Sequence, residues 1–260
     1  MQYSCAMHTP PSLPKPRAVI FDAYGTLFDV YSIAALAEQL FPGHGRALAL
    51  LWRDKQIEYT RLVTTSNHGA HYQNFWTLTE IALQYAIKAI VKNDHITLTS
   101  GLNSVNSPVL SLTQAGQAAA AQLMAQYKQL SPFPENKAVL EALQARGIPA
   151  GILSNGSPDM LDAAVQSAGF GTLLKHVLSV DSIRSYKTHP DAYALGPAAF
   201  GLPAAEILFV SSNSWDALAA TWYGYQTLWV NRQGLPFDEL GTQPTYVGGS
   251  LDAVLRVLNA

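Results

Sequence analysis

From Asn136 to the carboxyl terminus, short apolar runs alternate with helical segments, and this alternation constrains the fold more than any other feature of the chain. Strands are indicated at 148–153, 177–180, 207–210, 227–230 and 246–247, and helices at 136–146, from 157 onward, and at 190–200, 215–223 and 251–258. A regular alternation of strand and helix is typical of a parallel, doubly wound, Rossmann-like sheet. We therefore expect an α/β fold.

One more apolar run, Val19-Ile20-Phe21, lies near the start of the chain and leads directly into Asp22. Such a run is typical of a strand that is buried on both faces in a parallel sheet. Asp22 would then lie at the carboxyl end of this strand, where open α/β sheets bind their ligands. A carboxylate there is either a structural acid or a reactive group.

Helical spacing dominates the segment that separates this first strand from the alternating part. Helices are predicted at 30–40, 46–62, 72–91 and 118–130, with a polar break at 64–70 and a loop at 97–108. The predicted organisation is a tail (1–16), an α/β core (17–28 and 132–260) and an all-helical cap subdomain inserted between its two parts (29–131).

Composition excludes several classes of protein. Hydrophobic residues make up 48% of the chain, and the net charge is −2, so a large core is expected and a nucleic-acid or anionic-membrane partner is not. The single cysteine, Cys5, excludes an intrachain disulfide framework and indicates a reducing compartment. Because no apolar run has the length of a signal peptide core or a membrane span, a cytoplasmic protein without a membrane partner is expected.

Four polar loops follow the predicted strands. They contain Asp22, Ser154-Asn155, Ser185-Tyr186-Lys187, and the stretch 211–216 that ends at Asp216. The carboxyl ends of neighbouring parallel strands meet at one edge of a sheet, so an aspartate, a lysine and a second aspartate are expected to share one cleft.

Longer stretches around these loops carry a closer resemblance. The stretches are FDAYGTLFDV (21–30), LWRDKQIEYT (51–60), ILSNGSP (152–158) and FVSSNSWDA (209–217). In these stretches the chain resembles the haloacid dehalogenase superfamily and, within it, the L-2-haloacid dehalogenase branch. The likeness extends over about 18–258, and the combination of stretches is far more specific than one motif.

The resemblance implies a covalent mechanism in which Asp22 displaces halide from a short L-2-haloalkanoate with inversion. Water then hydrolyses the resulting ester and releases a 2-hydroxy acid. It further implies that no cofactor is needed, that the partner is a small 2-substituted carboxylic acid, and that the protein is a homodimer.

The resemblance also assigns roles within the site. Lys187 would keep Asp22 ionised, and Asp216 would balance Lys187 and position water. The other catalytic positions would be Thr26, Tyr193, Ser211 and Asn213. The substrate carboxylate would bind at Ser154 and the backbone near Ala23, and the halide at Arg53 with Asn155. The apolar wall would consist of Tyr24, Ile57, Phe75 and Trp215.

Two positions depart from the pattern of the branch. Asp54 stands where glutamine is common, and Arg61 stands where an aromatic residue is usual near the pocket. An added carboxylate could suit an amine leaving group, as in relatives that open the ring of L-azetidine-2-carboxylate. Hydrolysis of that ring by the same aspartate is therefore the alternative function.

A magnesium-dependent phosphatase is a less favoured alternative. Phosphatases of this superfamily carry a second aspartate two residues after the nucleophile, but Tyr24 occupies that position here. A halide leaves without a proton, so a dehalogenase needs no acid there. The final loop also has few carboxylates for a metal, and a metal-free site is expected.

Simpler, structural interpretations remain for three positions: Arg53 could lie on a solvated helix face, and Phe75 and Trp215 could be core aromatics. For Ser157 a helix cap is preferred.

Overall fold

The computed structural model of the protein describes residues 13–93 and 114–259. The predictions for Cys5, for most of the 1–16 tail and for the 97–108 loop concern residues outside these ranges. Within them, no helix has both the length and the apolar character needed to cross a bilayer.

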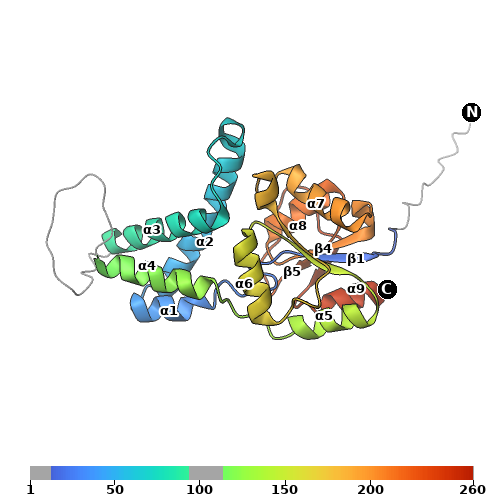
Figure 1. Cartoon of the computed structure of the whole chain (residues 1–260), viewed down its shortest axis with the longest axis horizontal. Coiled ribbons are helices and arrows are strands. Elements are labelled where there is room, and N and C mark those ends of the chain that lie inside the picture. Colours follow the sequence, from blue (N-terminus) through green and yellow to red (C-terminus); the bar gives the residue numbers. More distant parts are fainter. Residues whose placement is uncertain (1–12, 94–113, 260) are drawn as a thin grey trace, which may run out of the picture.

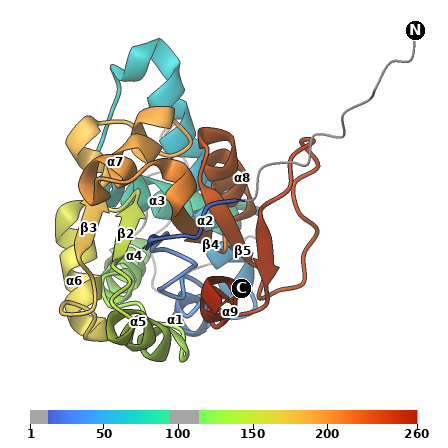
Figure 2. The ribbon, with the colours of Figure 1, turned by 90° about the vertical axis from the view of Figure 1, so that its right-hand side faces the viewer.

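Six parallel strands form one sheet in the order β3-β2-β1-β4-β5-β6 (Figures 1 and 2). They are β1 (Ala18–Phe21), β2 (Ala150–Ser154), β3 (His176–Ser179), β4 (Ile207–Ser211), β5 (Gln226–Val230) and β6 (Tyr246–Gly248). Every residue of β1, β2, β4 and β5 is buried, as expected for strands covered on both faces. The predicted doubly wound α/β fold is confirmed.

Helices cover both faces of this sheet. They are α5 (Asn136–Ala145), α6 (Pro158–Ala168), α7 (Pro190–Phe200), α8 (Ser214–Tyr223) and α9 (Ala253–Asn259). Helices α7 and α8 lie on one face and α5 and α9 on the other, while α6 packs beside β3 (Figure 1). The chain extends the sheet from β1 first toward β3 and then from β4 toward β6. The carboxyl ends of β1 and β4 therefore flank the point where a doubly wound sheet binds its ligand.

Four helices form a separate body beside the sheet (Figure 1). They are α1 (Ile33–Leu40), α2 (Gly45–Thr65), α3 (Phe75–Asn93) and α4 (Gln114–Tyr127). Their apolar faces pack on one another, and polar bonds fix the register of α2 on α3. The indole of Trp52 donates to the main-chain oxygen of Thr79 (2.8 Å), and the amide of Gln56 donates to the Thr79 hydroxyl (2.6 Å).

The two ends of this helical insertion lie side by side. Phe28 and Pro132 form an antiparallel bridge. The N–H of Asp29 donates to the oxygen of Ser131 (2.9 Å), and the N–H of Phe133 donates to the oxygen of Leu27 (3.2 Å). The chain therefore leaves the core just after β1 and rejoins it at the same place.

A second connection joins the insertion to the core through Tyr186. Its hydroxyl donates to the main-chain oxygen of Gln73 (2.6 Å), and its N–H donates to the hydroxyl of Thr64 (3.1 Å). Its ring stacks on Tyr72, whose hydroxyl bonds to the carboxylate of Asp181. The residue just before Lys187 is thus held by the helical insertion.

Some local predictions were wrong. The helix expected to start at residue 30 starts at Ile33, because a turn precedes it: the Asp29 carboxylate accepts from the N–H of Tyr31, and the Asp29 main-chain oxygen accepts from the hydroxyl of Ser32. The break expected at 64–70 is shorter, since α2 continues to Thr65 and is followed by one 3₁₀ turn. Ser157 does precede α6, but its side chain makes no capping hydrogen bond.

Candidate active site

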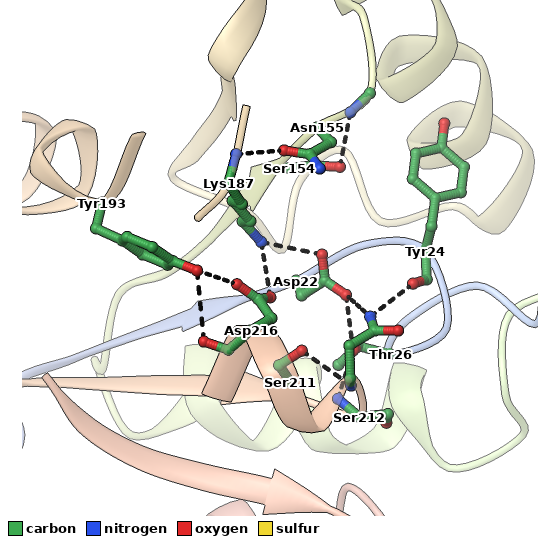
Figure 3. Close-up of polar contacts among 12 residues, drawn as sticks. Asp22, Tyr24, Thr26, Ser154, Asn155, Lys187, Tyr193, Ser211, Ser212 and Asp216 are labelled. Atoms are coloured by element: carbon green, nitrogen blue, oxygen red, sulfur yellow. Dashed lines mark hydrogen bonds and ion pairs between the residues drawn. The ribbon is translucent and has the colours of Figure 1, made fainter. Parts of the chain in front are cut away.

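Four loops at the carboxyl edge of the sheet converge on Asp22 (Figure 3). Asp22 follows β1, Ser154 ends β2, Lys187 lies between β3 and α7, and Asn213 and Asp216 lie between β4 and the first turn of α8. These are the four loops expected from the sequence. They come together because parallel neighbours end at the same edge.

The carboxylate of Asp22 accepts three hydrogen bonds. Its Oδ1 accepts from Nζ of Lys187 (3.0 Å). Its Oδ2 accepts from the hydroxyl of Thr26 (3.0 Å) and from the amide of Asn213 (2.8 Å). The group is therefore held in one orientation, and Oδ1 has the fewer donors of the two oxygens.

Lys187 lies between the two aspartates (Figure 3). Its Nζ is 2.9 Å from Oδ2 of Asp216, and the two side chains are only 1% and 0% exposed. Burial alone would lower the pKa of Lys187, but the carboxylates of Asp216 and Asp22 outweigh it and raise that pKa above the ordinary lysine value. The ammonium therefore stays charged beside Asp22.

Asp216 is buried beneath Asp22. Its Oδ1 accepts from the hydroxyl of Tyr193 (2.8 Å), and its Oδ2 accepts from Lys187. Burial raises the pKa of Asp216, although Lys187 opposes this rise, and burial raises the pKa of Tyr193 well above its ordinary value. Both oxygens are thus occupied, and Asp216 does not line the cavity beside Asp22. The geometry favours a role through Lys187 over the predicted positioning of water.

Several loop residues support their neighbours. The Thr26 hydroxyl accepts from the N–H of Ser212 (2.8 Å), and Ser211 accepts from the N–H of Asn213 (3.1 Å). Asn155 accepts from the N–H of Lys187 (2.9 Å). Ser154 accepts from the N–H of Gly156 (3.1 Å), and its hydroxyl hydrogen remains available to a ligand.

A narrow cavity of about 10 Å³ adjoins Asp22, and we call it the Asp22 cavity. It is lined by Asp22, Tyr24, Arg53, Ile57, Thr60, Phe75, Ser154, Asn155, Asn213 and Trp215. Nine of these ten residues are among the predicted site residues, and the tenth is Thr60. The ring of Tyr24 is fixed in the wall by stacking on Tyr127 and packing against Phe75.

Arg53 brings a positive charge from α2 into this cavity. Its Nη2 donates to the main-chain oxygen of Tyr24 (3.2 Å) and to Asn213 (3.3 Å), and its Nη1 donates to Gln56 (2.7 Å). Arg53 is therefore not on a solvated helix face. Three of the five N–H groups of the guanidinium thus have acceptors in Tyr24, Gln56 and Asn213, and the side chain also interacts with Tyr127.

Three predicted substrate-binding residues do not line the Asp22 cavity. Ala23 is buried behind it. Asp54 and Arg61 lie on the exposed side of α2, and among the described residues they form no ion pair with each other. Asp54 lines a larger surface groove of about 470 Å³, which we call the outer groove. Both line a shallower depression along α2, the side groove.

Among the residues that the structure describes, no three His, Cys, Asp or Glu side chains are arranged to hold a metal ion.

The sequence model of the haloacid dehalogenase-like hydrolase family matches residues 16–224 of the chain. The chain belongs to the haloacid dehalogenase superfamily.

Its relatives within the superfamily include a haloacetate dehalogenase of Moraxella sp. (strain B), 38% identical over 95% of this chain and 99% of that protein, and several L-2-haloacid dehalogenases. The (S)-2-haloacid dehalogenase of Pseudomonas sp. (strain YL) is 39% identical over 241 residues, which are 93% of this chain and 94% of that protein. The structure of L-2-haloacid dehalogenase RSc1362 is 51% identical, with a TM-score of 0.84, and covers 95% of this chain and 100% of its own. The chain therefore belongs to the L-2-haloacid dehalogenase branch.

The structure of another relative contains a covalently bound ligand. The L-2-haloacid dehalogenase from Xanthobacter autotrophicus, with chloropropionic acid covalently bound, is 31% identical, with a TM-score of 0.78, over 94% of this chain and 99% of its own.

Several residues that hold the side chains and loops of the site in place were not identified from the sequence. Gln56 and Tyr127 hold Arg53 through a buried polar contact, and Arg232 donates to Ser212 (2.7 Å) and to the oxygen of Thr26 (3.3 Å). Of these residues, only Gln56 could have been found from the sequence, since a residue three positions after Arg53 lies on the same side of a helix.

Proposed function

We propose that this protein hydrolyses short-chain L-2-haloalkanoic acids to 2-hydroxy acids, with inversion, through an ester on Asp22. The observation that carries this proposal is the Asp22 carboxylate, which is fixed by Lys187, Thr26 and Asn213 at the end of a small cavity with aromatic and aliphatic walls. The family and the sequence relatives support the same reaction.

In the first step, an oxygen of Asp22 attacks C2 of the substrate, and the carbon–halogen bond breaks with its electron pair leaving on the halide. Oδ1 is the better nucleophile because it accepts one hydrogen bond and Oδ2 accepts two. The apolar wall excludes water, which strengthens a carboxylate nucleophile. The product of this step is an ester between Asp22 and C2.

In the second step, water attacks the ester carbonyl carbon of Asp22. Negative charge develops on Oδ2, which faces the hydroxyl of Thr26 and the amide of Asn213. Donors placed where charge develops stabilise such an intermediate. The bond from the carbonyl carbon to Oδ1 then breaks. The 2-hydroxy acid keeps Oδ1, water supplies the new carboxylate oxygen of Asp22, and one proton is released.

The substrate carboxylate would bind to N–H groups at the ends of β1 and β2. Among the described residues, the N–H groups of Ala23, Tyr24 and Asn155 have no protein acceptor, and the Ser154 hydroxyl has a free hydrogen. The departing halide would bind to the guanidinium of Arg53, whose side chain lines the same cavity.

The rival functions receive less support. Ring opening of azetidine-2-carboxylate was considered because Asp54 could assist an amine leaving group, but Asp54 lines the outer and side grooves and not the Asp22 cavity. A phosphatase would need an acid at position 24, where the Tyr24 ring is packed among aromatic neighbours, and burial keeps the pKa of Tyr24 well above its ordinary value.

The proposal is tested by halide release from L-2-chloropropionate, with the D-enantiomer and L-azetidine-2-carboxylate assayed in parallel. Turnover in H₂¹⁸O, followed by mass spectrometry of the Asp22 peptide, should show label in Asp22. Asp22→Asn should lose activity, and Asp159→Asn, at an exposed aspartate of α6, should keep it. No halide release from any 2-haloalkanoate would refute the proposal, and phosphatase activity abolished by EDTA would favour the rival.

We also propose that the protein is a cytoplasmic homodimer. The family resemblance motivates both statements, and exposed apolar side chains on α2 and α3 (Leu50, Leu62, Ile81 and Tyr85) support the dimer. Light scattering at micromolar concentration tests it, and a monomer mass would contradict it. Cell fractionation tests the location.

A further inference from the structure

Two side chains separate the Asp22 cavity from the protein surface. Ile57 of α2 and Trp215 of α8 line the Asp22 cavity, the outer groove and the side groove alike. Ile57 comes from the helical insertion and Trp215 from the core. Ile57 and Trp215 are the only described residues that the Asp22 cavity shares with the side groove, so a molecule that enters from the side groove passes between these two side chains.

The backbone of Trp215 is held firmly, but its ring is not. Asn213, two residues earlier, binds both Asp22 and the oxygen of Tyr24. By contrast, the indole N–H of Trp215 has no acceptor among the described residues, whereas those of Trp52 and Trp229 do. The ring is only partly buried. It can thus rotate without disturbing the bonds to Asp22.

Arg61 covers the outer side of this ring. Its guanidinium carbon lies 5.0 Å from the centre of the Trp215 ring, within the range of a cation–π interaction. Arg61 follows Ile57 by four residues, so the two share one side of α2. The other charged groups of the side groove are Asp54 and Glu58, and Glu58 pairs with Lys55 (2.7 Å). In the described part of the chain, Trp215 is the sole partner of the Arg61 guanidinium.

We propose that Ile57 and Trp215 form a gate to the Asp22 cavity, and that Arg61 is a positioning residue that holds the ring of Trp215 in the closed position. The gate admits short 2-haloalkanoates and rejects longer ones, because a longer chain requires a larger displacement of the ring. The substrates named here rest on the proposed function, but the contact between Arg61 and Trp215 does not.

The kinetic test uses chain-length preference. In Arg61→Ala, the ratio of kcat/KM for 2-chlorohexanoate to that for L-2-chloropropionate should rise about two- to fivefold, which is the size expected for an exposed cation–π contact. Arg61→Lys keeps the charge and should restore part of the preference. Arg46→Ala, which removes an exposed charge at the start of α2, should leave the ratio unchanged. An unchanged ratio in an active Arg61→Ala enzyme would overturn the proposal.

A second readout does not depend on activity. Acrylamide quenching of Trp215 fluorescence is obtained as the difference between each protein and its Trp215→Phe counterpart. Quenching should be stronger in Arg61→Ala than in the parent protein, and the same in Arg46→Ala. Equal quenching in Arg61→Ala would refute the gate even if the protein released no halide, whereas stronger quenching without halide release would refute only the proposed function.

Discussion

The hydroxyl of Tyr186 donates to the main-chain oxygen of Gln73, 2.6 Å away, and so joins the residue before Lys187 to the helical insertion. Tyr186 is fully buried, and burial raises the pKa of its hydroxyl far above the ordinary value, so the group remains a donor. Lys187 in turn binds Asp22. The position of the insertion and the position of the lysine are therefore coupled.

Removing this single hydroxyl should disturb the site from a distance. We expect Tyr186→Phe to lower kcat about tenfold, because Lys187 loses part of its alignment. The free energy of unfolding should fall by about 1 kcal/mol, which is typical for one buried hydrogen bond. Steady-state kinetics and urea unfolding measure the two effects. Tyr85→Phe, at an exposed tyrosine of α3, is the control. An unchanged kcat in Tyr186→Phe would contradict the coupling.

The Thr26 hydroxyl should matter more than the Thr26 methyl group. Thr26→Val keeps the shape but removes the donor to Asp22 Oδ2 and the acceptor for the N–H of Ser212. We expect kcat to fall about 10²-fold, as for the loss of one donor to a developing oxyanion. Thr26→Ser keeps the hydroxyl and should retain most of the activity. Equal losses in the two variants, measured by halide release, would rule out this role.

The buried lysine balances two carboxylates, so its removal should cost stability as well as activity. We expect Lys187→Met to lower the free energy of unfolding by about 3–5 kcal/mol, since it leaves Asp216 buried without a counter-ion. Adding Asp216→Asn should recover part of this stability but none of the activity. Chemical denaturation of both variants provides the comparison. A double variant no more stable than the single one would show that the ion pair is not the cause.

The free energy of unfolding at acidic pH should depend on Glu135. Burial tends to raise the pKa of this carboxyl, but main-chain N–H groups and Arg232 outweigh burial and lower it. A lowered folded-state pKa means that the stabilisation is present above the ordinary glutamate value of about 4.3 and is lost as the pH falls through the folded-state value.

The difference in unfolding free energy between the wild type and Glu135→Gln should therefore shrink as the pH falls from about 6 to about 3. Unfolding in denaturant at each pH measures this difference. A difference that stays constant across this range would mean that Glu135 does not titrate in the expected direction.

Local signals allowed much of the core to be predicted. Pro190 at the first helical position and Gly201 at the carboxyl end give α7 the bounds expected from the sequence. The apolar run before Asp22 is β1, because a strand buried on both faces needs continuous apolar residues. The start of α1 could not be predicted, since it depends on how Asp29 binds in the turn before it.

The site was predicted where a residue acts through its own side chain at a strand end. Asp22, Lys187 and Asp216 are of this kind. Tyr186 could not be assigned, because its partner is a main-chain oxygen 113 residues away, and such an atom leaves no trace in the sequence. Asp54 and Arg61 lie outside the Asp22 cavity, which the sequence could not reveal because helical periodicity gives a side of α2 but not the depth of a side chain in the cleft.

The paired ends of the insertion, at Phe28 and Pro132, divide the enzyme's tasks along the chain. Asp22, which would form and break bonds, and its supports Lys187 and Asp216 belong to the α/β core, whereas Arg53 and Ile57 lie on the inserted helices. Because the helical insertion leaves and rejoins the core at one point, it can be replaced without shifting the register of any strand. Evolution, or an engineer, can thus change what enters the site, provided that the contacts of Tyr186 with Thr64 and Gln73 are kept.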